Sequence, residues 1–138
     1  MKESFKRILI VEDDPALSEL LKDVLEQHHY HCLFLPYTDE ILKVVHDFRP
    51  EVILLDYLLP VMNGEELCAC VKQNKSTCNI PVIIYSAFPQ TLLPVKDFMC
   101  DVFIAKPFDL NNLLNQLEKH VLRYRRKNRY GKTRVFLF

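Results

Sequence analysis

Asp56 is the residue of this sequence whose placement most needs a chemical explanation. It lies in the run VILLDYLLP, residues 52–60, where its neighbours on both sides are apolar. An isolated buried carboxylate is costly, so a buried aspartate normally has a partner. No helix-cap role for Asp56 is evident in the sequence. Its position therefore indicates a functional group whose partners come from other parts of the chain.

Five short runs rich in β-branched residues and leucine predict strands, because each is too short for a helix and is bounded by polar or turn residues. These runs are 7–11, 30–35, 51–56, 81–86 and 101–105. Helical patterns separate most of them, so strand and helix alternate along the chain. That alternation predicts an α/β domain in which helices cover both faces of a parallel sheet. One such domain fits the 138 residues.

Capping residues mark where the helices begin. Asp14 can cap a helix that follows directly, and Asn63 can cap another that carries a glutamate three residues on, as in a capping box. A helix is expected within 39–48, and Asp109 can cap the last helix. The segment 87–100 contains two prolines, so we expect only a short or irregular helix there.

Polar residues follow the predicted strands at the point where each strand ends. Glu12 and Asp13 follow the first strand, Asp56 ends the third, Ser86 ends the fourth and Lys106 follows the fifth. Each has an ordinary interpretation taken singly, as a cap, a turn residue or an exposed lysine. Ligands of open parallel sheets bind outside the carboxyl ends of the strands. The combination at one edge therefore indicates a binding site.

The chemistry of this set of side chains can be inferred from their types. Clustered carboxylates repel one another, and a hard divalent cation such as Mg²⁺ relieves that repulsion. A carboxylate such as Asp56 can act as a nucleophile and form an aspartyl phosphate. The resulting phosphoryl group needs counter-charge and hydrogen-bond donors, which Lys106 and Ser86 can supply. The residue types thus favour metal-assisted phosphoryl transfer to Asp56.

Four segments together resemble the receiver domain of two-component response regulators, the CheY-like superfamily. They are ILIVEDDP, VILLDYLLPVMNG, PVIIYSA and FIAKPF, in the family's order and at suitable separations. The resemblance covers roughly residues 5–122. It implies a doubly wound five-stranded parallel sheet of order 2-1-3-4-5, in a flavodoxin-like three-layer sandwich.

The resemblance also assigns metal and acceptor roles. Asp56 would accept a phosphoryl group from the phosphohistidine of a sensor histidine kinase or a histidine phosphotransfer protein. Asp13 and Asp56 would bind Mg²⁺ (or Mn²⁺), and Glu12 would act largely through a metal-bound water. The backbone carbonyl of Leu58 would complete the protein ligands.

Further roles concern the response to phosphorylation. Lys106 would pair with the phosphoryl group, and its bond to Pro107 is often cis in this family. Ser86 falls at the switch position and Phe103 at the aromatic switch position. Phosphorylation adds about −1.5 to −2 charge. Ser86 would move toward the new oxygens, and Phe103, which has no hydroxyl, would signal by moving its ring into the vacated space.

For its output, the resemblance implies a phosphorylated signalling domain and not an enzyme. We expect a single-domain response regulator in the cytoplasm that switches contacts with a downstream protein. A homodimer through the face of the fourth helix, fifth strand and fifth helix is a further expectation, whereas nucleic-acid binding and membrane insertion are not expected. The alternative within the family is a receiver fragment of a longer regulator with an effector domain.

Charge is unevenly distributed, although 18 basic residues balance 18 acidic ones. Seven lysines and arginines and no acids lie in 123–134, which leaves the remainder at net −7. We therefore separate a receiver domain, 5–122, from a basic extension, 123–138, expected as a frayed helix end followed by solvated chain. A linker or an interaction surface are alternatives for this extension. Its apolar end, residues 134–138, would pack on the body or extend an edge strand.

Two other classes of protein compete with this interpretation. Phosphatases of the haloacid-dehalogenase type also use an aspartate at a strand end, but commonly carry a second aspartate where this chain has Leu58. A flavodoxin-like nucleotide binder needs a phosphate-binding loop after its first strand, and the acidic VEDDP would repel phosphate. The histidines of HHYH, residues 28–31, are expected at an exposed helix end and not in a metal site. The five cysteines lack C-x-x-C spacing, which argues against zinc and for reduced thiols.

Overall fold

A computed structural model describes residues 5–87, 99–106 and 109–137, with the backbone alone for 129–137. Its centre is a sheet of five strands that are all parallel, in the order β2-β1-β3-β4-β5. The strands are β1 (Lys6–Val11), β2 (Tyr30–Leu35), β3 (Val52–Asp56), β4 (Val82–Ser86) and β5 (Val102–Ala105). The predicted fold class and strand order are therefore confirmed, and each strand begins within one residue of its predicted start.

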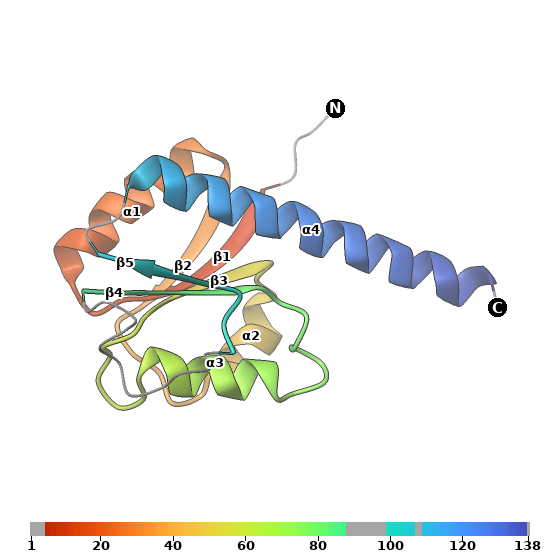
Figure 1. Cartoon of the computed structure of the whole chain (residues 1–138), viewed down its shortest axis with the longest axis horizontal. Coiled ribbons are helices and arrows are strands. Elements are labelled where there is room, and N and C mark those ends of the chain that lie inside the picture. The colour runs from red at the N-terminus through yellow and green to blue at the C-terminus, as the bar shows by residue number, and fades with distance from the viewer. Residues whose placement is uncertain (1–4, 88–98, 107–108, 138) are drawn as a thin grey trace.

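Helices cover both faces of this sheet. They are α1 (Pro15–Gln27), α2 (Ile41–Phe48), α3 (Gly64–Lys72) and α4 (Leu110–Leu137). Figure 1 shows α1 and α4 on one face and α2 and α3 on the other, which is the expected three-layer arrangement. The helix expected within 87–100 falls mainly on residues 88–98, which lie outside the described residues. Of the helices that the structure describes, none combines the length and apolarity needed to span a bilayer.

Two apolar clusters fill the spaces between the layers. Along β1, Ile8 and Ile10 belong to the cluster under α1 and α4, whereas Leu9 and Val11 belong to the cluster under α2 and α3. Successive side chains of a strand point to opposite faces, so a strand buried on both faces must be apolar throughout. This explains why the strands read as continuous apolar runs.

The caps predicted from the sequence are present. The Asp14 side chain accepts a hydrogen bond from the backbone N–H of Ala16 at 3.0 Å, at the start of α1. At the start of α3, Asn63 and Glu66 form a reciprocal capping box, with bonds of 2.8 and 3.0 Å. These caps fix where the chain turns after β1 and β3, the two strands whose ends carry the acidic residues.

The last helix is longer than the sequence predicted. It continues without a break through residue 122 to Leu137, and in Figure 1 its C-terminal part projects beyond the sheet. The expectation that residues 134–138 extend an edge strand is therefore wrong for the described residues, which are helical through 137. Arginine and lysine favour helix in an exposed segment, which accounts for the continuation. The domain boundary at residue 122 stays a prediction.

Candidate functional site

Asp56 lies at the carboxyl end of β3, not within its apolar middle. All five residues of β3 are buried, and Asp56 itself is 6% exposed. One of its carboxylate oxygens, Oδ1, accepts a hydrogen bond from the backbone N–H of Leu58 at 3.2 Å. The orientation of the Leu58 carbonyl toward a metal stays a prediction. The strand therefore delivers a mostly buried carboxylate to the edge where the predicted site residues meet.

Three carboxylates converge at this edge. Glu12, Asp13 and Asp56 each offer an oxygen, and these oxygens all lie within 4.8 Å of one another. Glu12 is buried, and its Oε2 accepts a hydrogen bond from the backbone N–H of Asp14 at 2.9 Å, while Asp13 is exposed. Clustered carboxylate oxygens from neighbouring loops are the donor set that Mg²⁺ takes in proteins. The residues present thus fit a hard divalent cation.

Lys106 supplies the positive charge opposite this cluster. Its Nζ lies 3.5 Å from Oδ2 of Asp56 and 3.6 Å from Oε1 of Glu12. Its backbone N–H donates to the carbonyl of Ser86 at 2.6 Å, which ties the end of β5 to the end of β4. The bond between Lys106 and Pro107 lies outside the described residues. The lysine is therefore placed between two acids and within reach of any group attached to Asp56.

The pKa of Asp56 reflects these neighbours. Burial and the charge of Glu12 raise it from an ordinary value of 3.8 to about 6, although Lys106 and the Leu58 N–H act in the opposite direction. Two buried carboxylates so close together disfavour ionisation of both. The site thus carries electrostatic strain that a cation would relieve.

Ser86 and Phe103 lie on the same face of the sheet. In the β4–β5 register, Ile84 pairs with Phe103 and Ser86 pairs with Ala105. Ile84 and Phe103 both belong to the cluster under α2 and α3, and alternation places Ser86 on that face too. Ser86 is fully buried and Phe103 is half-buried. Their positions are compatible with the coupled movement that we expect, which stays a prediction.

Tyr85 is a site residue that the sequence did not reveal. Its side chain belongs to the cluster under α1 and α4, and its hydroxyl donates a hydrogen bond to Oε1 of Glu12. The Nζ of Lys106 lies 4.6 Å from the centre of its ring. Burial, followed by the hydrogen bond and charge of Glu12, raises the pKa of Tyr85, so the phenol remains a donor. The only feature of the sequence that could have indicated this role is the tyrosine hydroxyl directly before Ser86, in an otherwise aliphatic strand.

The comparison with known families agrees with this geometry. The family described as "Response regulator receiver domain" matches residues 8–118. The chain belongs to this family. The competing phosphatase and nucleotide-binder interpretations are not favoured, because this match covers most of the chain.

Individual relatives of this receiver domain support the assignment. It is 35% identical over 120 residues to the phosphate regulon transcriptional regulatory protein PhoB of Pseudomonas aeruginosa. The aligned residues cover 86% of this chain and 52% of that protein. The receiver domain of a histidine kinase from Syntrophus aciditrophicus is 30% identical, with a TM-score of 0.73 over 84% of this chain and 89% of that one. The chain spans about half the length of the curated relatives that it matches.

A third relative is described together with ligands. The response regulator TrrA of Thermotoga maritima, in complex with Mg²⁺-BeF, is 25% identical and has a TM-score of 0.74. The alignment covers 84% of this receiver domain and 99% of that chain.

No second metal site of this type occurs among the described residues of the receiver domain. The group of Glu12, Asp13 and Asp56 is the only set of three such side chains that meets the distance requirement there. The histidines of HHYH are exposed, as expected. All five cysteines are free thiols.

Gly64 fixes how closely α3 approaches the acceptor strand. A Cβ added to Gly64 would lie 2.5 Å from the backbone oxygen of Asp56 and 3.0 Å from Cα of Tyr57. The N–H of Gly64 also donates to the carbonyl of Tyr57 at 2.9 Å. Because both close atoms belong to the backbone, no side chain can move aside. Glycine is required for the helix to begin directly beside Asp56.

Gly64→Ala is accordingly expected to destabilise the receiver domain. The methyl group would push α3 away from Asp56, at a cost of about 1 to 3 kcal/mol in the free energy of unfolding. Urea denaturation followed by circular dichroism measures this quantity. Gly131→Ala is the matched control, because alanine favours the α4 helix in which Gly131 lies. A Gly64→Ala variant as stable as the wild type would contradict the close approach.

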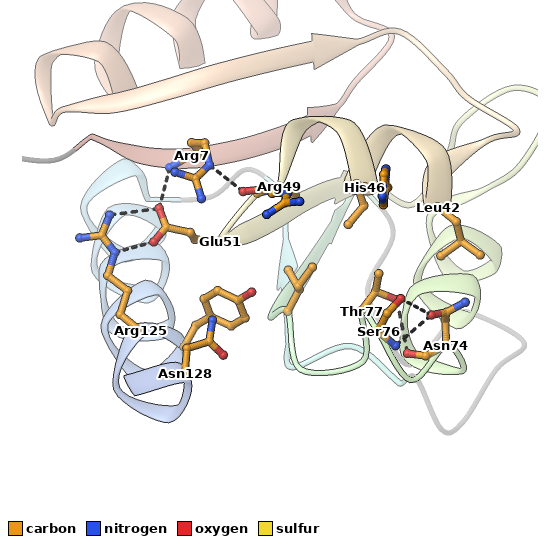
Figure 2. A pocket seen from close by; sticks show the side chains of 14 residues that line it. Arg7, Leu42, His46, Arg49, Glu51, Asn74, Ser76, Thr77, Arg125 and Asn128 are labelled. Carbon is orange, nitrogen blue, oxygen red and sulfur yellow. Dashed lines mark hydrogen bonds and ion pairs between the residues drawn. The ribbon is translucent and has the colours of Figure 1, made fainter. Parts of the chain in front are cut away.

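A cavity lies at the edge of the sheet opposite the acidic site. It has a volume of about 700 Å³ and is lined by residues at the amino ends of β1 and β3, by α2, by the loop after α3 and by α4. Figure 2 shows Glu51 between Arg125 of α4 and Arg7 of β1. Glu51 precedes β3 whereas Asp56 ends it, so this cavity does not belong to the acidic site.

The ion pair beside this cavity attaches α4 to the body of the receiver domain. Two nitrogens of Arg125, Nε and Nη2, bond to the two oxygens of Glu51 at 2.5 and 3.0 Å, and Nη2 also donates to the carbonyl of Phe5. Burial alone would raise the pKa of Glu51, but Arg125 and the backbone N–H of Arg7 hold it below its ordinary range. The part of α4 beyond residue 122 is thus anchored at its first turn.

Arg125→Gln should therefore lower the free energy of unfolding by about 1 to 3 kcal/mol, because it leaves the buried Glu51 carboxylate without its guanidinium partner. Folding lowers the pKa of Glu51, so its ionised carboxylate stabilises the folded protein at any pH above the pKa that it has in the unfolded chain. This contribution is lost as the pH falls through the pKa of the folded state. The loss should hence be full at pH 7 and fade in acid. Denaturant melts at several pH values measure it. Arg126→Gln, at the exposed neighbouring position, is the control, and equal effects of the two changes would refute the anchoring role.

Proposed function

We propose that this receiver domain accepts a phosphoryl group on Asp56 from the phosphohistidine of a sensor histidine kinase or a histidine phosphotransfer protein. The observation that carries the proposal is the placement of Asp56 between the acids Glu12 and Asp13 and the ammonium of Lys106. An oxygen of Asp56 forms the new bond to phosphorus while the bond from phosphorus to the histidine nitrogen breaks. The electron pair of that bond leaves with the imidazole.

Mg²⁺ is the cofactor that the carboxylates fit best. Asp13, Asp56 and the Leu58 carbonyl would hold it, and Glu12 would contact a water of its hydration shell. When bound, the cation neutralises charge on the phosphoryl oxygens. Lys106 would turn from the carboxylates toward the same oxygens, as a point charge. The complex of TrrA with Mg²⁺-BeF supports this choice. Mn²⁺ takes similar oxygen ligands and stays an alternative.

Ser86 and Phe103 would carry the signal away from the acceptor. The Ser86 hydroxyl would donate to a phosphoryl oxygen, and Phe103 would fill the space released on the same face of the sheet. Phosphorylation would thereby change the surface near β5 and α4. We expect this surface to bind a downstream protein or a second copy of the chain.

The role is signalling and not substrate turnover. The five free thiols favour a reducing compartment, so we place the domain in the cytoplasm. A receiver domain within a longer regulator is the second candidate, which the half-length match to PhoB favours. That relative is a transcriptional regulatory protein by name, so the expectation of no nucleic-acid contact stays a prediction.

Phosphorylation of the whole chain by acetyl phosphate tests the proposal. Intact mass spectrometry should find one added phosphoryl group in the presence of Mg²⁺ and none with EDTA. Hydroxylamine should remove the group, because it cleaves acyl phosphates. Profiling against purified histidine kinases then identifies the donor. Absence of labelling by every donor, or sustained hydrolysis of phosphate monoesters, would overturn the proposal.

A further inference from the structure

The carboxylate of Glu12 is held at both of its oxygens. Tyr85, which is 1% exposed, donates its hydroxyl to Oε1, and the backbone N–H of Asp14 donates to Oε2. Glu12 extends from the end of β1 and Tyr85 from β4, two strands with β3 between them. The hydrogen bond therefore spans the acceptor strand on the face that α1 and α4 cover. It fixes the direction in which Glu12 presents its charge.

Lys106 shares one of these oxygens with Tyr85. Its Nζ is 3.6 Å from Oε1 of Glu12, which is longer than a hydrogen bond, and 4.6 Å from the centre of the Tyr85 ring. It is also 3.5 Å from Oδ2 of Asp56. The phenol thus hydrogen-bonds to Oε1, whereas the ammonium lies too far from that oxygen for a hydrogen bond. The aromatic face gives the ammonium a second favourable contact.

We propose that Tyr85 is a positioning residue of the phosphoryl site, which holds Glu12 ready for Mg²⁺ and keeps Lys106 from closing onto Glu12. The inference rests on the proposed function and adds to it a residue outside the acceptor, metal and switch positions. Without the hydroxyl, Lys106 becomes the nearest donor to Oε1 and moves toward it. The ammonium then competes with the hydrated Mg²⁺ for Glu12 and withdraws from Asp56. Groups that orient metal ligands from outside commonly change metal affinity about 10- to 100-fold when removed.

Tyr30 provides a matched control within the same apolar cluster. It is 2% exposed, and the Nζ of Lys6 lies 4.5 Å from the centre of its ring, as Lys106 does over Tyr85. Its hydroxyl has no hydrogen-bond partner among the described residues. Tyr30→Phe and Tyr85→Phe thus each remove one buried phenol oxygen beneath a lysine. Only Tyr85→Phe removes a contact with a carboxylate of the site.

Calorimetric titration of the whole chain with MgCl₂ tests the proposal. Tyr85→Phe should weaken Mg²⁺ binding about tenfold, whereas Tyr30→Phe should leave it within about twofold of the wild type. Labelling by acetyl phosphate should be slower in Tyr85→Phe at low Mg²⁺ and should approach the wild-type rate at saturating Mg²⁺. An unchanged Mg²⁺ affinity, or a slower rate that persists at saturation, would overturn the inference. If the wild type neither binds Mg²⁺ nor is labelled, the proposed function itself fails.

A double variant separates positioning from a general loss of packing. If Tyr85 acts through Glu12, then adding Tyr85→Phe to Glu12→Gln should weaken Mg²⁺ binding no further, because the two changes remove the same arrangement. An equal additional loss in the Glu12→Gln background would instead mean that Tyr85 acts by packing alone. Thermal melts of all variants check that each is folded at the temperature of the titration.

Discussion

Asp56→Asn should abolish phosphorylation of the chain by acetyl phosphate and by any cognate kinase. The asparagine amide retains the shape of the side chain and can still accept the hydrogen bond from the Leu58 N–H. It lacks the anionic oxygen that attacks phosphorus, so the bond to the phosphoryl group has no nucleophile. Intact mass spectrometry in the presence of Mg²⁺ measures the loss, and peptide mapping of the wild type should place the group on Asp56.

Asp14→Asn is the control for this experiment. Asp14 is an exposed carboxylate two residues after Glu12, and asparagine caps a helix as well as aspartate does. This variant should therefore be labelled to the same extent as the wild type. Labelling of Asp56→Asn at the wild-type level would show that another side chain is the acceptor. Loss of labelling in both variants would point to damage of the loop after β1 instead.

Much of this fold can be predicted from the sequence because its elements obey strong local rules. Strands buried on both faces must be apolar throughout, and they were found within one residue of their starts. The caps Asp14 and Asn63 satisfy backbone donors with side-chain oxygens two or three residues away, so a short window contains the whole interaction. The attachment of α4 through Arg125 to Glu51 could not be predicted, because it joins residues that are 74 positions apart.

The candidate site also has one part that the sequence predicts and another part that it does not. The carboxyl ends of parallel strands meet at one edge, which is sufficient to bring Glu12, Asp13, Asp56 and Lys106 together from sequence alone. The role of Gly64 depends on the distance between two backbone segments, which the sequence does not record. The contact of Tyr85 with Glu12 could not be predicted, because a strand pattern identifies the face that a side chain occupies, but not the polar atom that it reaches.

Asp56→Asn should also make the protein more stable in the absence of Mg²⁺. In the folded wild type, burial and Glu12 raise the pKa of Asp56 from 3.8 to about 6. At pH 8 the carboxyl group of Asp56 is ionised in both states, but its ionisation costs more free energy in the folded state. One pKa unit corresponds to about 1.4 kcal/mol. The free energy of unfolding should therefore increase by about 2 to 3 kcal/mol in Asp56→Asn. The exposed fraction of 6% means that little solvent screening reduces this value.

The pH dependence of this gain has a defined sign. Because the folded-state pKa lies above the unfolded one, the wild-type penalty is full above pH 6 and disappears as the pH falls toward 4, where both states bind the proton. Urea melts of wild type and Asp56→Asn in EDTA should therefore differ most at pH 8 and converge near pH 4. Adding Mg²⁺ at pH 8 should stabilise the wild type more than the variant, because the cation binds the folded acidic cluster and replaces the missing counter-charge. A difference that is constant with pH, or a wild type more stable than Asp56→Asn in EDTA, would contradict a strained acidic site and would mean that Lys106 already balances its charge.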